Sequence, residues 1–270
     1  MSNRKLLSAS SAILEKAGEL GASLAGFAGV EDLRSAPGFT LAPQLPGVDE
    51  GVGTRDNTTG MGPGRVQWPE NARSVLVIGL EHPKEKPEMD WWFGRISPPG
   101  NKLLMGIIRE LCRWTLETLE INVFHFPYHI EKGGIYLKDA AVLAGLGCIG
   151  RNNLLITPRY GPRVRLRAMA LDVPMPSTGP MGFDPCRICD DLCRRACPRK
   201  AYEETLYTPE AYGQSILPGR DGTYARPVCG RQMQKNIDSA KEEKADGFDA
   251  PVKIIRYCRN CELACPVGRT

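Results

Sequence analysis

The sequence lacks any long apolar run. Its longest, residues 75–80, is far shorter than the ~20 apolar residues that a membrane helix needs. A signal peptide is also missing, because Glu15, Lys16 and Glu19 occupy the positions where its apolar core would lie. No internal repeat and no low-complexity tail is present. These absences predict a globular cytoplasmic protein with no membrane association.

A strong charge of either sign is absent as well. The formal net charge of the 270 residues is +4, which is too small to indicate a nucleic-acid-binding surface. Hydrophobic residues make up 42% of the chain, which is ordinary for a soluble globular protein. The length allows one sizeable core with a smaller module attached to it.

The first 175 residues alternate between predicted strands and helices. Helical spacing of apolar residues predicts helices over 6–20, 103–119 and 137–144, and apolar runs predict strands over 23–30, 74–80, 122–126 and 165–171. Two stretches rich in Pro and Gly, residues 36–70 and 81–100, are predicted to be irregular. The alternation indicates an α/β domain over residues 1–175 and, across a Pro/Gly linker at 174–182, a second domain over residues 176–270.

What the sequence has in excess is cysteine. Eight of its ten cysteines lie between Cys186 and Cys265. A reducing cytoplasm disfavours disulfides, so clustered cysteines in this setting indicate metal ligands. Outside the cluster, Cys112 lies on the apolar side of a predicted helix and is expected in the core.

The spacing of the eight cysteines predicts two [4Fe–4S] clusters. Each cubane needs four thiolates, and in two-cluster ferredoxins the Cys that precedes Pro ligates the other cluster. Here Cys197 and Cys265 each precede Pro. The first cluster is assigned to Cys186, Cys189, Cys193 and Cys265, and the second to Cys197, Cys229, Cys258 and Cys261.

Two alternatives accompany this assignment. The chain has three residues between Cys189 and Cys193 where the usual ferredoxin run has two; the extra residue can bulge out of the loop, or the pairing can differ. Structural zinc is the other possibility, because two C-x2-C pairs can form a tetrahedral site. Basic residues near the first group form either a solvated face or a surface that raises the cluster potential or receives an acidic electron donor. They are Arg187, Arg194, Arg195, Arg199 and Lys200.

A glycine motif precedes the cysteines. Residues 145–150 fit GxGxxG, and Asp172 follows at the distance expected of a dinucleotide site. The context excludes that interpretation, because the motif follows a predicted helix where the fingerprint requires a strand. Pro158 and Pro162 also leave no room for the helix that should follow.

The run Ala144-Gly-Leu-Gly-Cys-Ile-Gly-Arg-Asn-Asn-Leu-Leu-Ile156, continued by Thr157-Pro-Arg-Tyr-Gly161, resembles the signature of the epoxyqueuosine reductases and their relatives, the reductive dehalogenases. The resemblance extends over residues 74–265. It implies the α+β class. An α/β cobalamin-binding, nitroreductase-like domain would precede a bacterial ferredoxin-like domain with two [4Fe–4S] clusters.

The resemblance also implies a corrinoid held between the α/β domain and the clusters. Glycine has no side chain to keep a ligand away, and Asn side chains can hydrogen-bond the corrin amides. At one of these positions the family has Trp where this chain has Cys, which is alternatively a small buried hydrophobe. The expected cofactor-binding residues are Gly145, Gly147, Cys148, Ile149, Gly150, Arg151, Asn152 and Asn153. Trp91 and Trp92 either cap the flat macrocycle or cover the core.

The implied reaction needs a protein acid. The candidates are Glu131, Tyr136 and His129, followed by Tyr128 and Asp139, and Glu131 matches the family's acidic residue only loosely. Ferredoxin or flavodoxin would supply electrons through both clusters to the corrinoid, which would reduce a small-molecule or nucleoside-like substrate. A tRNA substrate is less expected, because the chain stops five residues after Cys265 without the helical repeats of the tRNA enzyme. The alternative function is an electron carrier or a reductive activator of a partner corrinoid protein.

Overall fold

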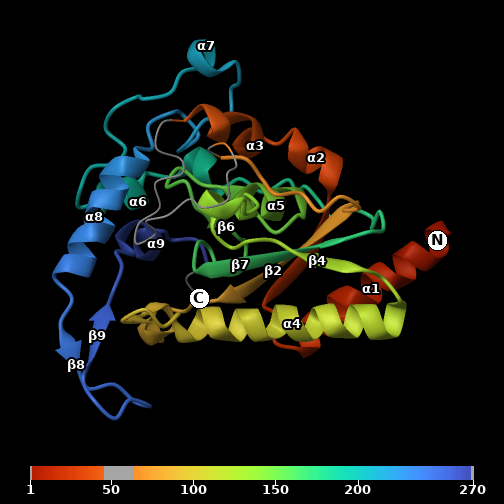
Figure 1. Cartoon of the computed structure of the whole chain (residues 1–270). Coiled ribbons are helices and arrows are strands. Elements are labelled where there is room, and N and C mark those ends of the chain that lie inside the picture. The colour runs from red at the N-terminus through yellow and green to blue at the C-terminus, as the bar shows by residue number, and fades with distance from the viewer. Residues whose placement is uncertain (1, 46–61, 63, 269–270) are drawn as a thin grey trace.

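The computed structural model describes residues 2–45, 62 and 64–268 (Figure 1). At its centre is a four-stranded sheet in the order β1-β2-β7-β4, and each neighbouring pair is antiparallel. The mixed α+β class is therefore confirmed, while the alternation of elements does not produce a parallel sheet. The strands are β1 (Leu24–Gly29), β2 (Ser74–Glu81), β4 (Val123–His125) and β7 (Val164–Leu171).

The apolar run in β2 is explained by helices on both faces of the sheet. Leu76 and Ile78 lie in one hydrophobic core, whereas Val75 and Val77 lie in the other. A strand that is covered on both sides can be apolar at consecutive positions, because each side chain reaches a core. The strand prediction for residues 74–80 is confirmed.

The predicted helices are confirmed. On one face of the sheet lie α1 (Asn3–Glu19) and α4 (Pro99–Leu119), and the other face carries α2 (Val30–Arg34), α3 (Pro37–Leu41) and α5 (Leu137–Leu143) (Figure 1). Pro99 occupies the first turn of α4, where its missing N–H leaves no hydrogen bond unmade. The hairpin of β5 (Cys148–Ile149) and β6 (Leu155–Ile156) lies beside α5.

The two stretches predicted to be irregular contain short elements. In the first lie α3 and the 3-10 helix η1 (Ala42–Gln44), while residues 46–61 and 63 fall outside the described chain. In the second lie η2 (Pro87–Asp90) and β3 (Trp92–Phe93). Trp92 packs edge-on against Tyr257, and the guanidinium of Arg256 lies 4.3 Å from the ring centre of Trp91. Both tryptophans thus contact the C-terminal part of the chain.

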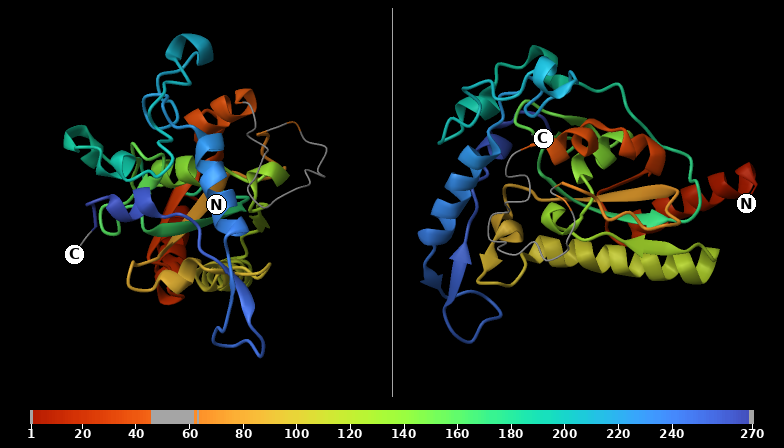
Figure 2. Two further views of the ribbon diagram at one scale, coloured as in Figure 1. Left: turned by 90° about the vertical axis from the view of Figure 1, so that its left-hand side faces the viewer. Right: turned by 45° about the horizontal axis from the view of Figure 1, so that its top comes forward.

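The C-terminal elements gather at one end of the sheet (Figure 2). Strand β9 pairs with β8 and with β3, so residues 92–93 and 252–255 share one small sheet. None of the helices in the described ranges is long and apolar enough to cross a bilayer. The elements are η4 (Pro185–Ile188), α6 (Leu192–Arg195), α7 (Pro209–Tyr212), α8 (Arg226–Asp238), β8 (Glu242–Glu243), β9 (Val252–Ile255) and α9 (Asn260–Ala264).

The predicted linker at 174–182 is held against the body. The Thr178 hydroxyl donates to the carbonyl oxygen of Ala144 at 2.7 Å and accepts from the backbone N–H of Phe27 at 2.8 Å. Because these contacts join β1, the end of α5 and the linker, the path of the chain into the cysteine-rich region is fixed.

Candidate functional site

The first predicted set of cysteines comes together around a cavity of about 260 Å³. Burial, together with the nearby Cys265, Cys186 and Cys189, raises the pKa of Cys193 to about 11. All four residues line the cavity. Cys265 follows α9 and arrives from a segment more than seventy residues away in sequence from the other three. The fold thus places the predicted distant ligand beside its three partners.

The second predicted set converges in the same way. Burial raises the pKa of Cys229, on α8, and the neighbouring Cys197 and Cys258 raise it further. Burial also raises the pKa of Cys261 to about 12, with contributions from Cys229 and Cys258. Cys229 therefore lies within electrostatic reach of the other three thiols, while the assignment of these four residues to one cluster stays a prediction.

The donor chemistry of both sets fits an iron–sulfur cluster. Each set supplies four cysteine sulfurs, which is the ligand count of a [4Fe–4S] cubane. The cavity lined by the first four provides space for such a group. Among the described residues, no three His, Cys, Asp or Glu side chains lie close enough to share a single metal ion. A cubane does not require that geometry, because each sulfur binds a different iron.

The extra residue between Cys189 and Cys193 is accommodated by a left-handed turn. Asp191 has φ +57°, a conformation that Asp tolerates better than most residues, and it precedes α6. Its carboxylate forms an ion pair with Arg151 of the glycine motif at 2.7 Å. The bulge therefore connects the first cysteine loop to the glycine motif.

Three of the basic residues near the first set, Arg194, Arg199 and Lys200, contact polar side chains. Arg194 contacts Asp221 at 2.8 Å, and Lys200 contacts Glu203 at 2.9 Å. Arg199 donates to Gln232 at 3.0 Å. The two ion pairs reduce the positive charge available to an acidic electron donor, whereas the neighbouring Ile188 is 93% exposed.

The glycines of residues 145–150 allow close approach of the protein's own backbone. A Cβ on Gly147 would overlap the carbonyl group of Ile156 in β6. A Cβ on Gly145, where φ is +71°, would lie 2.7 Å from the carbonyl oxygen of Thr178. The motif thus packs the β5–β6 hairpin and the linker tightly together. Its predicted contact with a corrinoid stays a prediction.

The two asparagines of the motif make internal contacts. Asn152 is 2% exposed, and its side chain accepts from the N–H of Leu154 and donates to the carbonyl oxygen of Cys261 at 3.4 Å. The side-chain oxygen of Asn153 accepts from the N–H of Gly219 at 3.2 Å. The Asn152 contact joins the glycine motif to Cys261 of the second set, and the Asn153 contact joins it to the loop at Gly219.

The two remaining cysteines differ in their surroundings. Cys112 is buried in the α1/α4 core and lies 3.2 Å from the sulfur of Met169, as predicted for a core residue. Cys148 is half-buried, and burial together with the nearby Cys186 raises its pKa to about 11. A ninth thiol therefore borders the first cysteine set.

The acid candidates differ in their burial and in their hydrogen-bond partners. Tyr136 is buried and donates to the carbonyl oxygen of Gly64 at 2.8 Å. His129 stacks edge-on against Tyr128. Asp139 is buried and accepts from the N–H of Gly38 at 2.9 Å, and burial raises its pKa. Glu131 lies in the 3-10 helix η3 (Ile130–Lys132), but its side chain is outside what the structure describes.

The sequence and the fold of this chain are similar to those of known proteins. No family model matches the chain. An epoxyqueuosine reductase from Lactococcus garvieae is 23% identical over 209 residues, or 74% of this chain and 53% of that protein. A tetrachloroethene reductive dehalogenase from Sulfurospirillum multivorans is 40% identical over 78 residues, or 28% of this chain and 15% of that protein. The structure of epoxyqueuosine reductase from Streptococcus thermophilus aligns with a TM-score of 0.60 at 19% identity, over 96% of this chain and 66% of that one.

The chain is similar to the epoxyqueuosine reductases and reductive dehalogenases. The predicted resemblance is thereby confirmed. The chain spans about half the length of the L. garvieae reductase that it matches. Both families use cobalamin and two [4Fe–4S] clusters.

Two tyrosines of this chain, Tyr202 and Tyr224, lie near the second cysteine set and were not predicted to belong to the site. The hydroxyl of Tyr202 donates to the carbonyl oxygen of Asn152 at 3.1 Å, and the ring of Tyr224 lies 5.6 Å from that of Tyr202. Lys138 was also missed, and its ammonium donates to the carbonyl oxygen of Asn153 at 2.6 Å. No sequence spacing connects these residues to the cysteines, so only their three-dimensional positions identify them.

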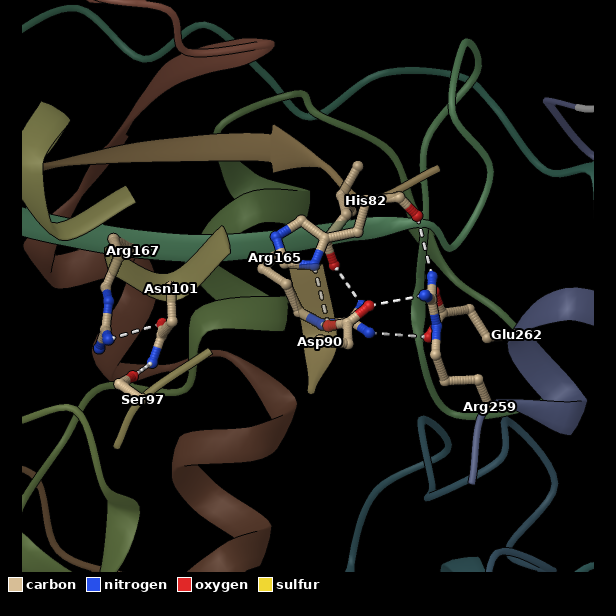
Figure 3. A network of polar contacts seen from close by, with 9 residues as sticks. His82, Asp90, Ser97, Asn101, Arg165, Arg167, Arg259 and Glu262 are labelled. Carbon is tan, nitrogen blue, oxygen red and sulfur yellow. Dashed lines mark hydrogen bonds and ion pairs between the residues drawn. The ribbon is translucent and has the colours of Figure 1, made fainter. Parts of the chain in front are cut away.

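A buried ionic network docks α9 onto the body (Figure 3). Asp90 accepts from the His82 ring at 2.8 Å and from Arg165 at 2.9 Å, and its second oxygen lies 2.7 Å from Arg259 as a charge contact. Glu262 pairs with Arg165 at 3.1 Å and with Arg259. Since Glu262 directly follows Cys261, the network positions the loop that carries the second cysteine set.

Replacing Gly147 with alanine is expected to destabilise the glycine motif and the β5–β6 hairpin that packs against it. The new Cβ would overlap the carbonyl of Ile156, so β6 must shift, at a cost on the order of 1–3 kcal/mol. Urea denaturation monitored by circular dichroism measures the loss. Gly106→Ala is the matched control, because a Cβ there meets nothing and alanine favours helix α4. Equal stability of the two variants would contradict the tight packing of the motif.

Proposed function

We propose that the chain is an iron–sulfur oxidoreductase of the epoxyqueuosine reductase kind. It passes electrons through two [4Fe–4S] clusters to a cobalamin that reduces a small or nucleoside-like substrate. The observation that carries this proposal is the crossed convergence of eight cysteines into two sets of four. Four sulfurs per set match two cubanes, and a crossed arrangement favours electron transfer by keeping the clusters close.

Residues 1–175 would form the corrinoid-binding region and residues 176–270 the ferredoxin-like region. The residues that would hold the corrinoid are those of the glycine motif, residues 145–153, which border the first cysteine set through Arg151 and Cys148. When bound, the corrinoid supplies a strongly reducing metal centre. The polypeptide would exclude water and supply the proton, for which Glu131, Tyr136 and His129 stay the candidates.

The substrate class is a small or nucleoside-like electrophile. A structural relative, an epoxyqueuosine reductase, was solved with a tRNA stem loop carrying the modified base, which supports the nucleoside-like end of that range. An electron donor such as ferredoxin or flavodoxin fits the low potentials that such clusters reach. The partly exposed first cysteine loop, with Ile188 at its surface, is where it would approach.

Anaerobic purification followed by metal analysis tests the proposal. We expect about eight irons and eight sulfides per chain, and one corrinoid after incubation with hydroxocobalamin under reducing conditions. Eight irons without corrinoid uptake would indicate an electron carrier or a reductive activator instead. Zinc in place of iron would overturn the redox assignment altogether. The Cys112→Ala variant, altered in the core alone, serves as the control and should keep the full iron content.

A further inference from the structure

Arg167 is a partly buried arginine of β7 without an acidic partner. Its guanidinium donates to the side-chain oxygen of Asn101 at 2.8 Å. Among the described residues, no carboxylate pairs with it, and its buried Nε has no hydrogen-bond acceptor. Removing a cation from water costs free energy unless an opposite charge or hydrogen-bond acceptors compensate it. The described part of the chain therefore leaves this positive charge uncompensated.

Arg165, two positions earlier on the same strand, shows the contrast. Side chains two apart on a strand face the same side of the sheet. Arg165 pairs with Asp90 at 2.9 Å and with Glu262 at 3.1 Å. Burial alone would lower the pKa of Arg165, but these two carboxylates raise it above the ordinary value, whereas burial lowers the pKa of Arg167. One face of β7 thus carries a neutralised guanidinium beside one that is not neutralised (Figure 3).

Two neighbours hold the Arg167 guanidinium in place. The side-chain amide of Asn101 donates to the hydroxyl oxygen of Ser97 at 2.7 Å, which turns the amide oxygen toward Arg167 (Figure 3). The ring centre of Tyr128 lies 3.6 Å from the guanidinium carbon. Stacking of this kind covers the flat face of a guanidinium and leaves the N–H groups at its edge able to donate.

The same place is open to solvent and adjoins two of the acid candidates. Tyr128 is 43% exposed, and its ring packs edge-on against His129. A charged planar fork of donors matches the paired oxygens of a carboxylate or a phosphate. An anion that compensates Arg167 would therefore lie next to Tyr128 and His129.

We propose that Arg167, Asn101 and Tyr128 form a binding site for an oxyanion, namely a carboxylate or a phosphate group. Arg167 donates to its oxygens, Asn101 holds the guanidinium, and Tyr128 covers the flat face. The place of this site in the reaction rests on the proposed function, in which it would hold the anionic group of the substrate beside the acid candidates. Anion binding itself involves none of the cysteines.

Isothermal titration calorimetry tests the site on the full-length, anaerobically purified protein. Inorganic phosphate and acetate are titrated separately into chloride buffer of matched ionic strength. We expect binding of at least one of the two anions, weakened about tenfold or more in Arg167→Gln because a charge-assisted hydrogen bond is lost. Tighter binding of phosphate would identify a phosphate-bearing ligand, and tighter binding of acetate a carboxylate. Binding of neither anion by the parent protein would overturn the site.

Arg113→Gln is the matched control, because Arg113 is an exposed arginine that already pairs with Glu110. This variant should bind the anion as the parent protein does. Unchanged affinity in Arg167→Gln, or an equal loss in Arg113→Gln, would contradict a specific site at Arg167.

Thermal unfolding separates anion binding from a purely structural role. In chloride, Arg167→Gln should unfold at the same temperature as the parent protein or higher, because it removes an uncompensated charge. The bound anion should raise the midpoint of the parent protein but not that of the variant. A lower midpoint in chloride with the same anion-induced rise in both proteins would overturn the site. Anion binding by parent protein that lacks iron would overturn the two-cluster function alone, and eight irons without anion binding would overturn the anion site alone.

Discussion

Replacing Cys197 and Cys229 together with serine is expected to remove one cluster and leave the other intact. The two thiols lie within electrostatic reach of each other although they sit on separate segments, after α6 and on α8. In the crossed arrangement both belong to the second cluster, so the iron content should fall from about eight to about four per chain. Iron analysis and electron paramagnetic resonance of the anaerobically purified variant measure this.

The same double variant separates the crossed arrangement from an uncrossed one. If Cys197 were grouped with the three cysteines that precede it in sequence, the two substitutions would damage both clusters, and the iron content would approach zero. A second pair, Cys193→Ser with Cys265→Ser, should likewise remove one cluster, this time the first. Loss of all iron from either pair would refute the assignment.

Asp90→Asn is expected to lower the free energy of unfolding by about 3–5 kcal/mol, because Arg165 and Arg259 must then share the carboxylate of Glu262. The Asp90 carboxylate pairs with Arg165 and Arg259, and both arginines are at least two-thirds buried. The variant should also loosen α9, which carries Cys261 and leads into Cys265, so that iron is released faster on mild chelation than from the parent protein. Guanidinium denaturation and timed iron release measure the two effects.

The pH dependence of this effect has a defined sign. Burial by itself would raise the pKa of Asp90, but the hydrogen bond from His82 and the charges of Arg165 and Arg259 lower it below the ordinary 3.8. A carboxylate with a lowered folded-state pKa contributes stability above its unfolded pKa and loses it as the pH falls through the folded value. The difference between the parent protein and Asp90→Asn should be full at pH 7 and shrink in acid below 3.8.

Glu110→Gln is the matched control for this experiment. Glu110 also pairs with an arginine, Arg113, but both side chains are exposed on α4. Solvent and salt screen such a pair, so no measurable change in stability is expected. A similar loss of stability in both variants would mean that burial of the Asp90 network does not increase its contribution to the free energy of unfolding.

Local structure was well predicted because it depends on neighbours in sequence. Apolar residues at helical spacing in α1 and α4 and the apolar run in β2 identify these elements from a few adjacent positions. The direction of the strands was not predictable in this way. Strand pairing depends on the route of the connections between strands, and those connections run through long segments without periodic patterns.

The ligands of the site were predictable to a lesser extent. Cysteine spacing and the Cys-Pro pairs identify two groups of four, since few other chemistries need that pattern. The residues that surround the sulfurs carry no comparable pattern. Tyr202 and Tyr224 lie among ordinary loop residues, and the backbone of His82 meets Arg259 across 177 positions of sequence.

The sequence by itself determined the positions of the helices and strands, the number of thiols and their division into two sets. Each of these follows from residue type and short-range spacing. Only the tertiary structure decided the antiparallel sheet, the docking of α9 through Asp90, and the contact of Asn152 with the backbone of Cys261. These depend on contacts between distant segments, whose free energy arises only when the whole chain has folded and excluded water from between them.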